Sequence, residues 1–284
     1  MTDLARSEPV DSKAATAAIK PRVSRYRVAG EGSTFWISVA SVVAVLALWV
    51  VATHAGWIRP LFLPKPQAIW AAAQQAIAGQ LDNNPLWIHI GWSLFRVVTA
   101  FVLAVVVGIP VGLAMGLSRV SRGLFDPIIE FYRPLPPLAY LPLMIIWFGI
   151  GETSKVLLIF LACFAPVALA TRAGVRSASQ EQIQAARSMG ASRMQVVRHV
   201  ILPTALPDIL VGLRIGMGVG WTTLVAAEMV AANAGLGQMV LNASNFLRTD
   251  VVIMGIIVIG AFAFLFEIAM RRLEAWLVPW KGKV

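Results

Sequence analysis

Residues 181–203, EQIQAARSMGASRMQVVRHVILP, are a polar and basic island with long apolar stretches on both sides. Ser179 with Gln182, and Ser192 with Gln195, have the three-residue spacing of capping boxes, so each serine can begin a short helix. Two such helices make a poor lining for a pore. They are better suited to bind a partner protein on the cytoplasmic side.

The two helices meet at Gly190, which can take the left-handed backbone angles that end a helix. Pro203 follows, and we expect the second helix to end before it. Residues 181–203 are therefore predicted to form a helix–glycine–helix unit.

The composition around this unit is that of a membrane protein. Of 284 residues, 58% are hydrophobic and 13% charged, whereas soluble domains have about 25% charged residues. The net charge of +10 could point to nucleic acid, but the positions of the charges argue against that.

A helix needs about 20 mostly apolar residues to cross a bilayer. The sequence predicts an all-α polytopic protein with about six transmembrane helices, of which the third is interrupted by prolines. The predicted spans are 35–52, 96–117 (starting as early as Trp87), 125–150, 156–171, 207–232 and 251–266.

The distribution of lysine and arginine orients these spans. With six spans and a cytoplasmic N-terminus, 17 of these residues lie inside and four outside, which follows the positive-inside rule. Both termini and a loop at 172–206 are then cytoplasmic. Residues 1–34 are predicted to be a disordered cytoplasmic tail, and residues 35–284 one membrane domain.

Two ladders of small residues lie on the second and fifth predicted spans. Glycines at every fourth position let helix backbones approach closely in lipid. We expect helix packing within the chain; the alternative is a seam between two copies. The ladders are Gly108, Gly112 and Gly116, and Gly212, Gly216 and Gly220.

Ionisable residues inside spans are candidates for function. Glu228 either faces the translocation pathway or forms a buried pair with an arginine, for which Arg214 is the nearest candidate. Asp126, Glu130 and Arg133 are predicted to form an ion cluster at the membrane interface, with Glu130 and Arg133 paired on one helix face.

The run Pro134-Leu135-Pro136-Pro137 breaks helical hydrogen bonding at membrane depth. Broken backbone is tolerated there where it lines a water-filled path or is buried in protein. We therefore place Tyr132, Pro136 and Tyr140, together with Glu228, in the pathway wall.

Several motifs of catalysis and cofactor binding are absent from the sequence. It has no P-loop for ATP, no cysteine and histidine spacing for a metal, and no convincing catalytic triad. An ion-driven carrier usually has more acidic groups deep in its spans, so a secondary carrier is the weaker alternative and a membrane-embedded enzyme weaker still.

Residues 184–203 resemble the EAA loop of permease subunits from bacterial ATP-binding-cassette importers. Gln184 stands where the family favours glutamate and Val200 where it favours isoleucine, and Glu181 could substitute for the missing glutamate. The resemblance assigns coupling to the ATPase to Glu181, Gln184, Ala185, Ala186, Gly190, Val200, Leu202 and Pro203.

The wider chain looks like the branch of that family that imports sulfonates, nitrate and related small anions. The stretches that carry this likeness are LFLPKPQ (61–67), DPIIEFYRPLPPLAYLPLMIIWFGIGETSK (126–155), GLRIGMGVGWTTLVAAEM (212–229) and LVPW (277–280). The resemblance implies a type I importer permease fold, with taurine or a related alkanesulfonate as cargo. Nitrate, another sulfonate or a pyrimidine-type precursor is the alternative.

The resemblance also implies the assembly. Two copies of the chain would sit in the bacterial inner membrane on a cytoplasmic ATPase dimer, and a periplasmic or lipid-anchored binding protein would deliver the substrate. ATP and Mg would bind to the ATPase, leaving this chain without catalytic activity, cofactor or metal and with lipid but no nucleic acid as a further partner.

Overall fold

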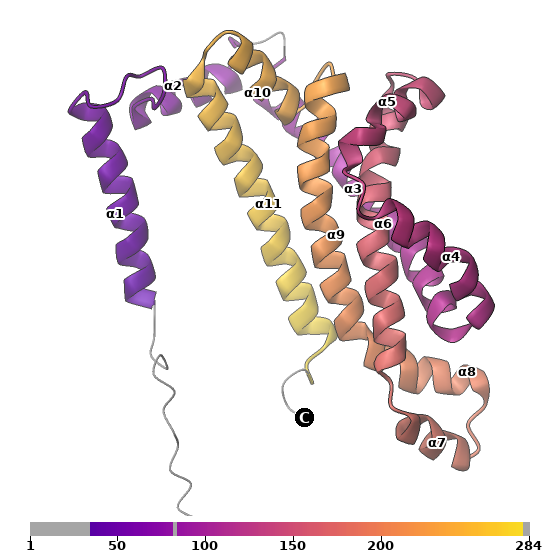
Figure 1. Cartoon of the computed structure of the whole chain (residues 1–284). Helices are drawn as coiled ribbons and strands as arrows, with labels where there is room; N and C mark the ends of the chain where they lie inside the picture. The colour runs from indigo at the N-terminus through magenta and orange to yellow at the C-terminus, as the bar shows by residue number, and fades with distance from the viewer. Residues whose placement is uncertain (1–34, 82–83, 281–284) are drawn as a thin grey trace, which may run out of the picture. The chain divides into compact units, whose positions relative to one another are not determined.

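The computed structural model of the chain describes residues 35–81 and 84–280, and the secondary structure within them is helical. The chain divides into two compact units, Met1–Trp49 and Val50–Val284. The predicted tail, residues 1–34, lies outside the described residues. The helices are α1 (Phe35–His54), α2 (Pro66–Ile77), α3 (Leu86–Leu117), α4 (Arg119–Tyr132), α5 (Pro137–Phe148), α6 (Glu152–Ser177), α7 (Gln180–Ser188), α8 (Arg193–Val196), a π-helical turn (Val197–Ile201), α9 (Leu202–Ala231), α10 (Leu236–Asn245) and α11 (Thr249–Leu277) (Figure 1).

Five helices of the described residues are long and apolar enough to cross a membrane: α1, α3, α6, α11 and the continuous helix that contains α8 and α9. The predicted interruption of the third span by prolines is confirmed. Residues 125–150 contain the end of α4 and the shorter apolar helix α5, separated by residues 133–136. The prolines at 134, 136 and 137 cause the break, because they have no N–H to donate to a helix.

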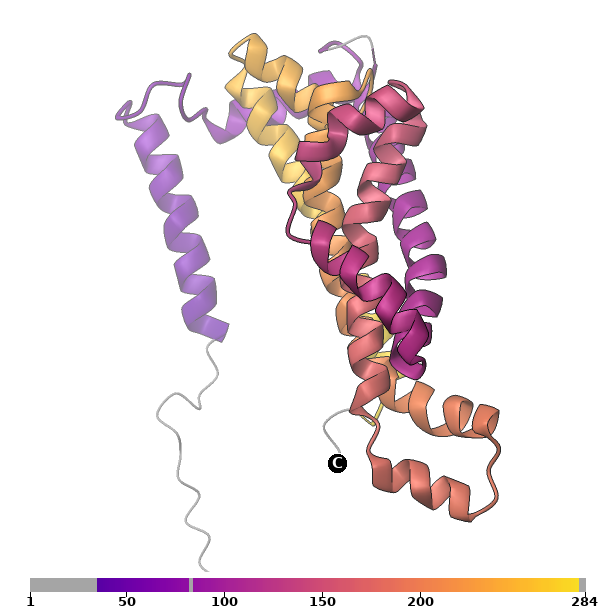
Figure 2. The ribbon, with the colours of Figure 1, turned by 45° about the vertical axis from the view of Figure 1, so that its right-hand side comes forward.

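Helix α6 is the centre of the second unit and packs along its length against α3 and α9 (Figure 1). The buried positions of α3 include Val97, Ala100, Ala104, Gly108 and Gly112, a spacing of three or four that marks one face. Helices α7 and α8 project from one end of the bundle, whereas α2 and α10 lie at the other (Figure 2).

The glycine ladders of α3 and α9 both face α6. A Cβ on Gly112 would lie 2.5 Å from the carbonyl oxygen of Ala168, and one on Gly212 would lie 2.3 Å from the Cβ of Ala170. These faces are therefore occupied inside one chain, which does not support the alternative of a seam between two copies.

The closeness of α3 and α6 makes a first prediction. Gly112→Ala should lower the free energy of unfolding by about 1–3 kcal/mol, because the new methyl group meets backbone that cannot move aside. Thermal unfolding of the purified chain in detergent measures the change. Gly91→Ala is the matched control on the same helix, since a Cβ there meets nothing within 4 Å. Equal stability of the two variants would contradict the close packing.

The two helices predicted within residues 181–203 are present, with a capping box at Ser179 and another at Ser192. Gly190 between them has φ +85°, as predicted. The predicted end of the second helix was wrong. α8 continues through the π-helical turn into α9, so that Pro203 lies in the first turn of α9. The turn precedes Pro203 because the nitrogen of proline cannot donate the α-helical hydrogen bond.

Candidate functional site

Three features of the second unit are candidates for function: the α7–α8 pair at one end, an ion cluster at the other end, and a cavity between them. In the α7–α8 pair, Ala186 and Val196 are buried and belong to the same apolar cluster as Val175 and Ile201 of the adjoining helices. The pair is therefore anchored to the ends of α6 and α9 by its own small core.

The remaining surface of the α7–α8 pair is open. Met189 and Met194 are among the most exposed large apolar side chains of the described residues. A hollow of about 390 Å³ lies between the two helices, and Gly190 and Val200 contribute to it. Of the residues predicted to couple, Glu181, Gln184, Ala185, Gly190 and Leu202 are exposed, Val200 and Pro203 are half-buried, and Ala186 is buried.

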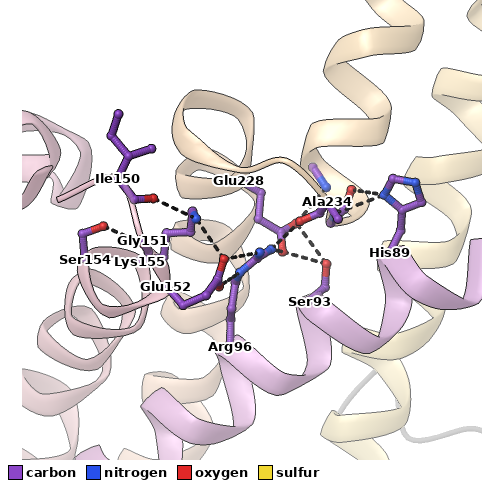
Figure 3. Close-up of polar contacts among 12 residues, drawn as sticks. His89, Ser93, Arg96, Ile150, Gly151, Glu152, Ser154, Lys155, Glu228 and Ala234 are labelled. Carbon is purple, nitrogen blue, oxygen red and sulfur yellow. Dashed lines mark hydrogen bonds and ion pairs between the residues drawn. The ribbon is translucent and has the colours of Figure 1, made fainter. Parts of the chain in front are cut away.

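The ion cluster is centred on Arg96 of α3, which is 1% exposed (Figure 3). The Arg96 guanidinium donates to Glu228 of α9 at 2.7 Å and to Glu152 of α6 at 2.9 Å. It also donates to the carbonyl oxygen of Ala234 at 2.7 Å. Lys155 adds a second cation, 3.0 Å from Glu152. Two cations therefore face two carboxylates, and the cluster joins α3, α6 and α9.

Glu228 is 0% exposed and holds the start of α10 in place. Its carboxylate accepts hydrogen bonds from the Ser93 hydroxyl at 2.7 Å and from the Gly237 N–H at 2.9 Å. Ser93 in turn accepts from the N–H of Leu236 at 2.9 Å. A negative charge at a helix N-terminus satisfies unpaired N–H groups and the helix dipole.

The backbone before α10 fits closely around Glu228. Gly235 has φ +146°, and a Cβ there would lie 2.5 Å from the carboxyl carbon of Glu228. A side chain at position 235 is thus excluded both by the positive φ and by the closeness of the Glu228 carboxylate.

The structure corrects the predicted partners of two acidic residues. Glu228 pairs with Arg96 rather than Arg214, which instead lies 3.1 Å from Glu267 of α11. Arg214 lies 14 residues before Glu228 on α9, about 21 Å along the helix axis, which is too far for the two side chains to meet. The hydrogen bonds and the ion pair of Glu228 lie within the cluster, and Glu228 is not among the residues that line the cavity between α6 and α9.

Glu130 does not pair with Arg133 as predicted. Its carboxylate lies 3.8 Å from Arg172 of α6, which also binds Asp126. Arg172 therefore binds both acidic side chains of α4. Arg133, the predicted partner of Glu130, instead lines the cavity between α6 and α9.

The cavity has a volume of about 510 Å³ and lies among α6, α9 and the segment that joins α4 to α5. Of the residues predicted for the pathway wall, Tyr132 and Tyr140 line it. Pro136 is absent from the lining residues of the described chain, although its neighbours Leu135 and Pro137 are present.

Sequence reasoning did not identify Arg96 as the centre of a site. Its position inside an apolar span was a usable signal, because a charge within a span needs a buried partner or a function. Ser93 and Glu152 carry no such signal, because their partners Glu228 and Arg96 lie more than 50 positions away in the sequence.

Comparisons with known proteins agree on one family. Residues 104–279 match the model for the binding-protein-dependent transport system inner membrane component. The chain is 56% identical over 250 residues to the taurine transport system permease protein TauC of Escherichia coli (strain K12), covering 87% of this chain and 90% of that protein. It is 37% identical to the putative aliphatic sulfonates transport permease protein SsuC of the same strain, covering 84% and 89%.

A solved structure supports the fold. A chain of the MetNI methionine ABC transporter in inward-facing conformations superposes with a TM-score of 0.60 at 21% identity, covering 68% of this chain and 97% of that chain.

Proposed function

The chain belongs to the family of binding-protein-dependent transport system inner membrane components, and from this premise we propose that it carries taurine or a related alkanesulfonate through the membrane as the permease subunit of an ATP-driven importer. It is a multi-pass component of the inner membrane and a non-catalytic subunit. The observation that carries the cargo proposal is the identity with a taurine permease over most of both chains. Another small anion is the alternative, since relatives named for other aliphatic sulfonates match nearly as much of the chain.

The α7–α8 pair is proposed as the contact with the ATPase. The support is its position and shape. Two capped helices project from the bundle (Figure 1). They expose methionines and enclose a hollow. α7 follows directly after α6, and α8 leads into α9. The coupling residues are those predicted: Glu181, Gln184, Ala185, Ala186, Gly190, Val200, Leu202 and Pro203.

The partners follow from the same proposal. The family name implies a substrate-binding protein, and an ATP-driven importer needs ATPase subunits. We infer a cytoplasmic ATPase dimer, a periplasmic or lipid-anchored binding protein, a second copy of this chain and surrounding lipid. ATP and Mg belong to the ATPase, and this chain needs no cofactor or metal of its own.

The cavity beside Tyr132 and Tyr140 is proposed as part of the translocation pathway. Its support is the broken helix between α4 and α5, since irregular backbone at this depth needs protein or water around it. Pro136 shapes that break without lining the cavity. Glu228 is assigned to the ion cluster instead, because its carboxylate has no exposed surface.

Reconstitution tests the proposal. Vesicles that contain the chain with its ATPase subunits should take up labelled taurine only when both ATP and the binding protein are supplied. Competition by unlabelled sulfonates and nitrate then ranks the cargo. Uptake by the chain alone, driven by an ion gradient and indifferent to the ATPase, would contradict the proposal and support a secondary carrier.

A further inference from the structure

The cavity between α6, α9 and the α4–α5 connection lies at the middle of two membrane spans. The residues of α6 that line it are between 161 and 170, and those of α9 are Ile215 and Val219. Both sets lie near the midpoints of Glu152–Ser177 and Leu202–Ala231. At about 510 Å³, the cavity is within the usual size range of small-molecule sites.

The lining of this cavity is apolar apart from three side chains. Leu161, Ala165, Leu169 and similar residues form most of its wall, and Tyr132, Arg133 and Tyr140 supply its polar side-chain atoms. The Tyr132 hydroxyl donates to the carbonyl oxygen of Leu161 at 3.4 Å. The Tyr140 hydroxyl has no hydrogen bond to another residue of the described chain, so it is available to a ligand.

Arg133 brings a positive charge to this cavity without a carboxylate to balance it. The two acidic side chains of α4, Asp126 and Glu130, both contact Arg172. Within residues 35–81 and 84–280, no acidic group lies within 4.0 Å of the Arg133 guanidinium, whereas Arg96 and Arg214 have acidic partners. Arg133 is exposed and lines the cavity, so its guanidinium is accessible to an anion that enters there.

We propose that Arg133 makes this cavity a transient binding site for a small oxyanion, with the Tyr140 hydroxyl as a second donor. A guanidinium presents several N–H groups in one plane and binds two oxygens of an anionic group at once. The apolar wall suits a short carbon chain, and the single cation suits a group of charge −1. The identification of that anion as a sulfonate rests on the proposed function; the anion site itself does not.

The first test measures the electrostatic charge at the cavity by the rate of thiol labelling, which does not require transport activity. The described chain has one cysteine, Cys163, which is 0% exposed, so Leu135→Cys adds an accessible thiol to the cavity wall. In permeabilised membranes, this thiol is labelled with a sulfonate-bearing methanethiosulfonate and with its trimethylammonium counterpart. Addition of Arg133→Gln should lower the ratio of anionic to cationic labelling rates by about tenfold. Taurine should slow the anionic reagent only while Arg133 is present.

Arg119→Gln is the matched control, because Arg119 also has no acidic partner among the described residues but lies at the start of α4, outside the cavity lining. It should leave the labelling ratio unchanged. A ratio equally unchanged by Arg133→Gln would overturn the anion site. In reconstituted vesicles, Arg133→Lys should retain more taurine uptake than Arg133→Gln. If the labelling ratio falls but the unaltered chain carries no sulfonate, the anion site stands and the proposed cargo fails.

Discussion

Replacing Arg96 with methionine is expected to cause the largest loss of stability of any single change in the ion cluster. Arg96 is 1% exposed and Glu228 is 0% exposed, so the variant leaves a buried carboxylate without its cation. The carbonyl oxygen of Ala234 also loses its donor. Removing one partner of a buried pair costs about 3–5 kcal/mol. We expect a correspondingly lower midpoint of thermal unfolding in detergent.

Arg214→Met is the matched control for this prediction. Arg214 also pairs with acidic residues of a neighbouring helix, but its side chain is 37% exposed. An exposed pair contributes about 0–1 kcal/mol, so this variant should stay close to the original protein. The double variant Arg96→Met with Glu228→Met should recover part of the loss, since no charge is then left buried. Equal stability of Arg96→Met and Arg214→Met would show that the cluster does not hold the helix ends together.

The parts of the fold that were predictable have local causes. The capping boxes at Ser179 and Ser192 and the turn at Gly190 depend on residues within a few positions of one another. The long spans depend on apolar composition. Both signals are present in any single sequence.

The parts that were not predictable depend on tertiary packing. The partner of Glu228 lies 132 residues away on α3, and the partner of Glu130 lies on α6. Spacing on one helix favoured Arg133 for Glu130, but α6 brings Arg172 to the same place. The proline-rich segment signalled a break, but its outcome as two short helices depends on how α4 and α5 lie against α6.

The arrangement of α6 and α9 connects the two ends of the bundle. α7 adjoins the end of α6, and α8 continues into α9 through the π-helical turn. At the other end, Arg96 links Glu152 of α6 to Glu228 of α9. Between these ends, the glycines of α9 bring the two helices into close contact. A push on α7 and α8 would therefore move α6 and α9 together, as a rigid body, and displace one wall of the cavity.

Gly190→Val is expected to abolish this coupling while the chain remains folded in the membrane. Gly190 has φ +85°, and a Cβ there would meet nothing within 4 Å. The change is therefore opposed by backbone strain alone, which for a β-branched residue is about 1–2 kcal/mol or more. The chain can relieve this strain by opening the turn, with loss of the hydrogen bond from Gly190 N–H to the Arg187 carbonyl oxygen.

An opened turn alters the angle between α7 and α8, so the proposed ATPase contact no longer fits. Taurine uptake and transport-linked ATP hydrolysis in reconstituted vesicles should both fall by at least about tenfold, equivalent to 1.4 kcal/mol or more. Gly190→Asn should retain most activity, because asparagine tolerates left-handed angles. Gly123→Val is the control for added bulk, since a Cβ at Gly123 also meets nothing within 4 Å and its φ is not positive. The turn at Gly190 sets the angle between α7 and α8. Unchanged ATP hydrolysis in Gly190→Val would therefore mean that the ATPase acts on the bundle through contacts other than the α7–α8 pair.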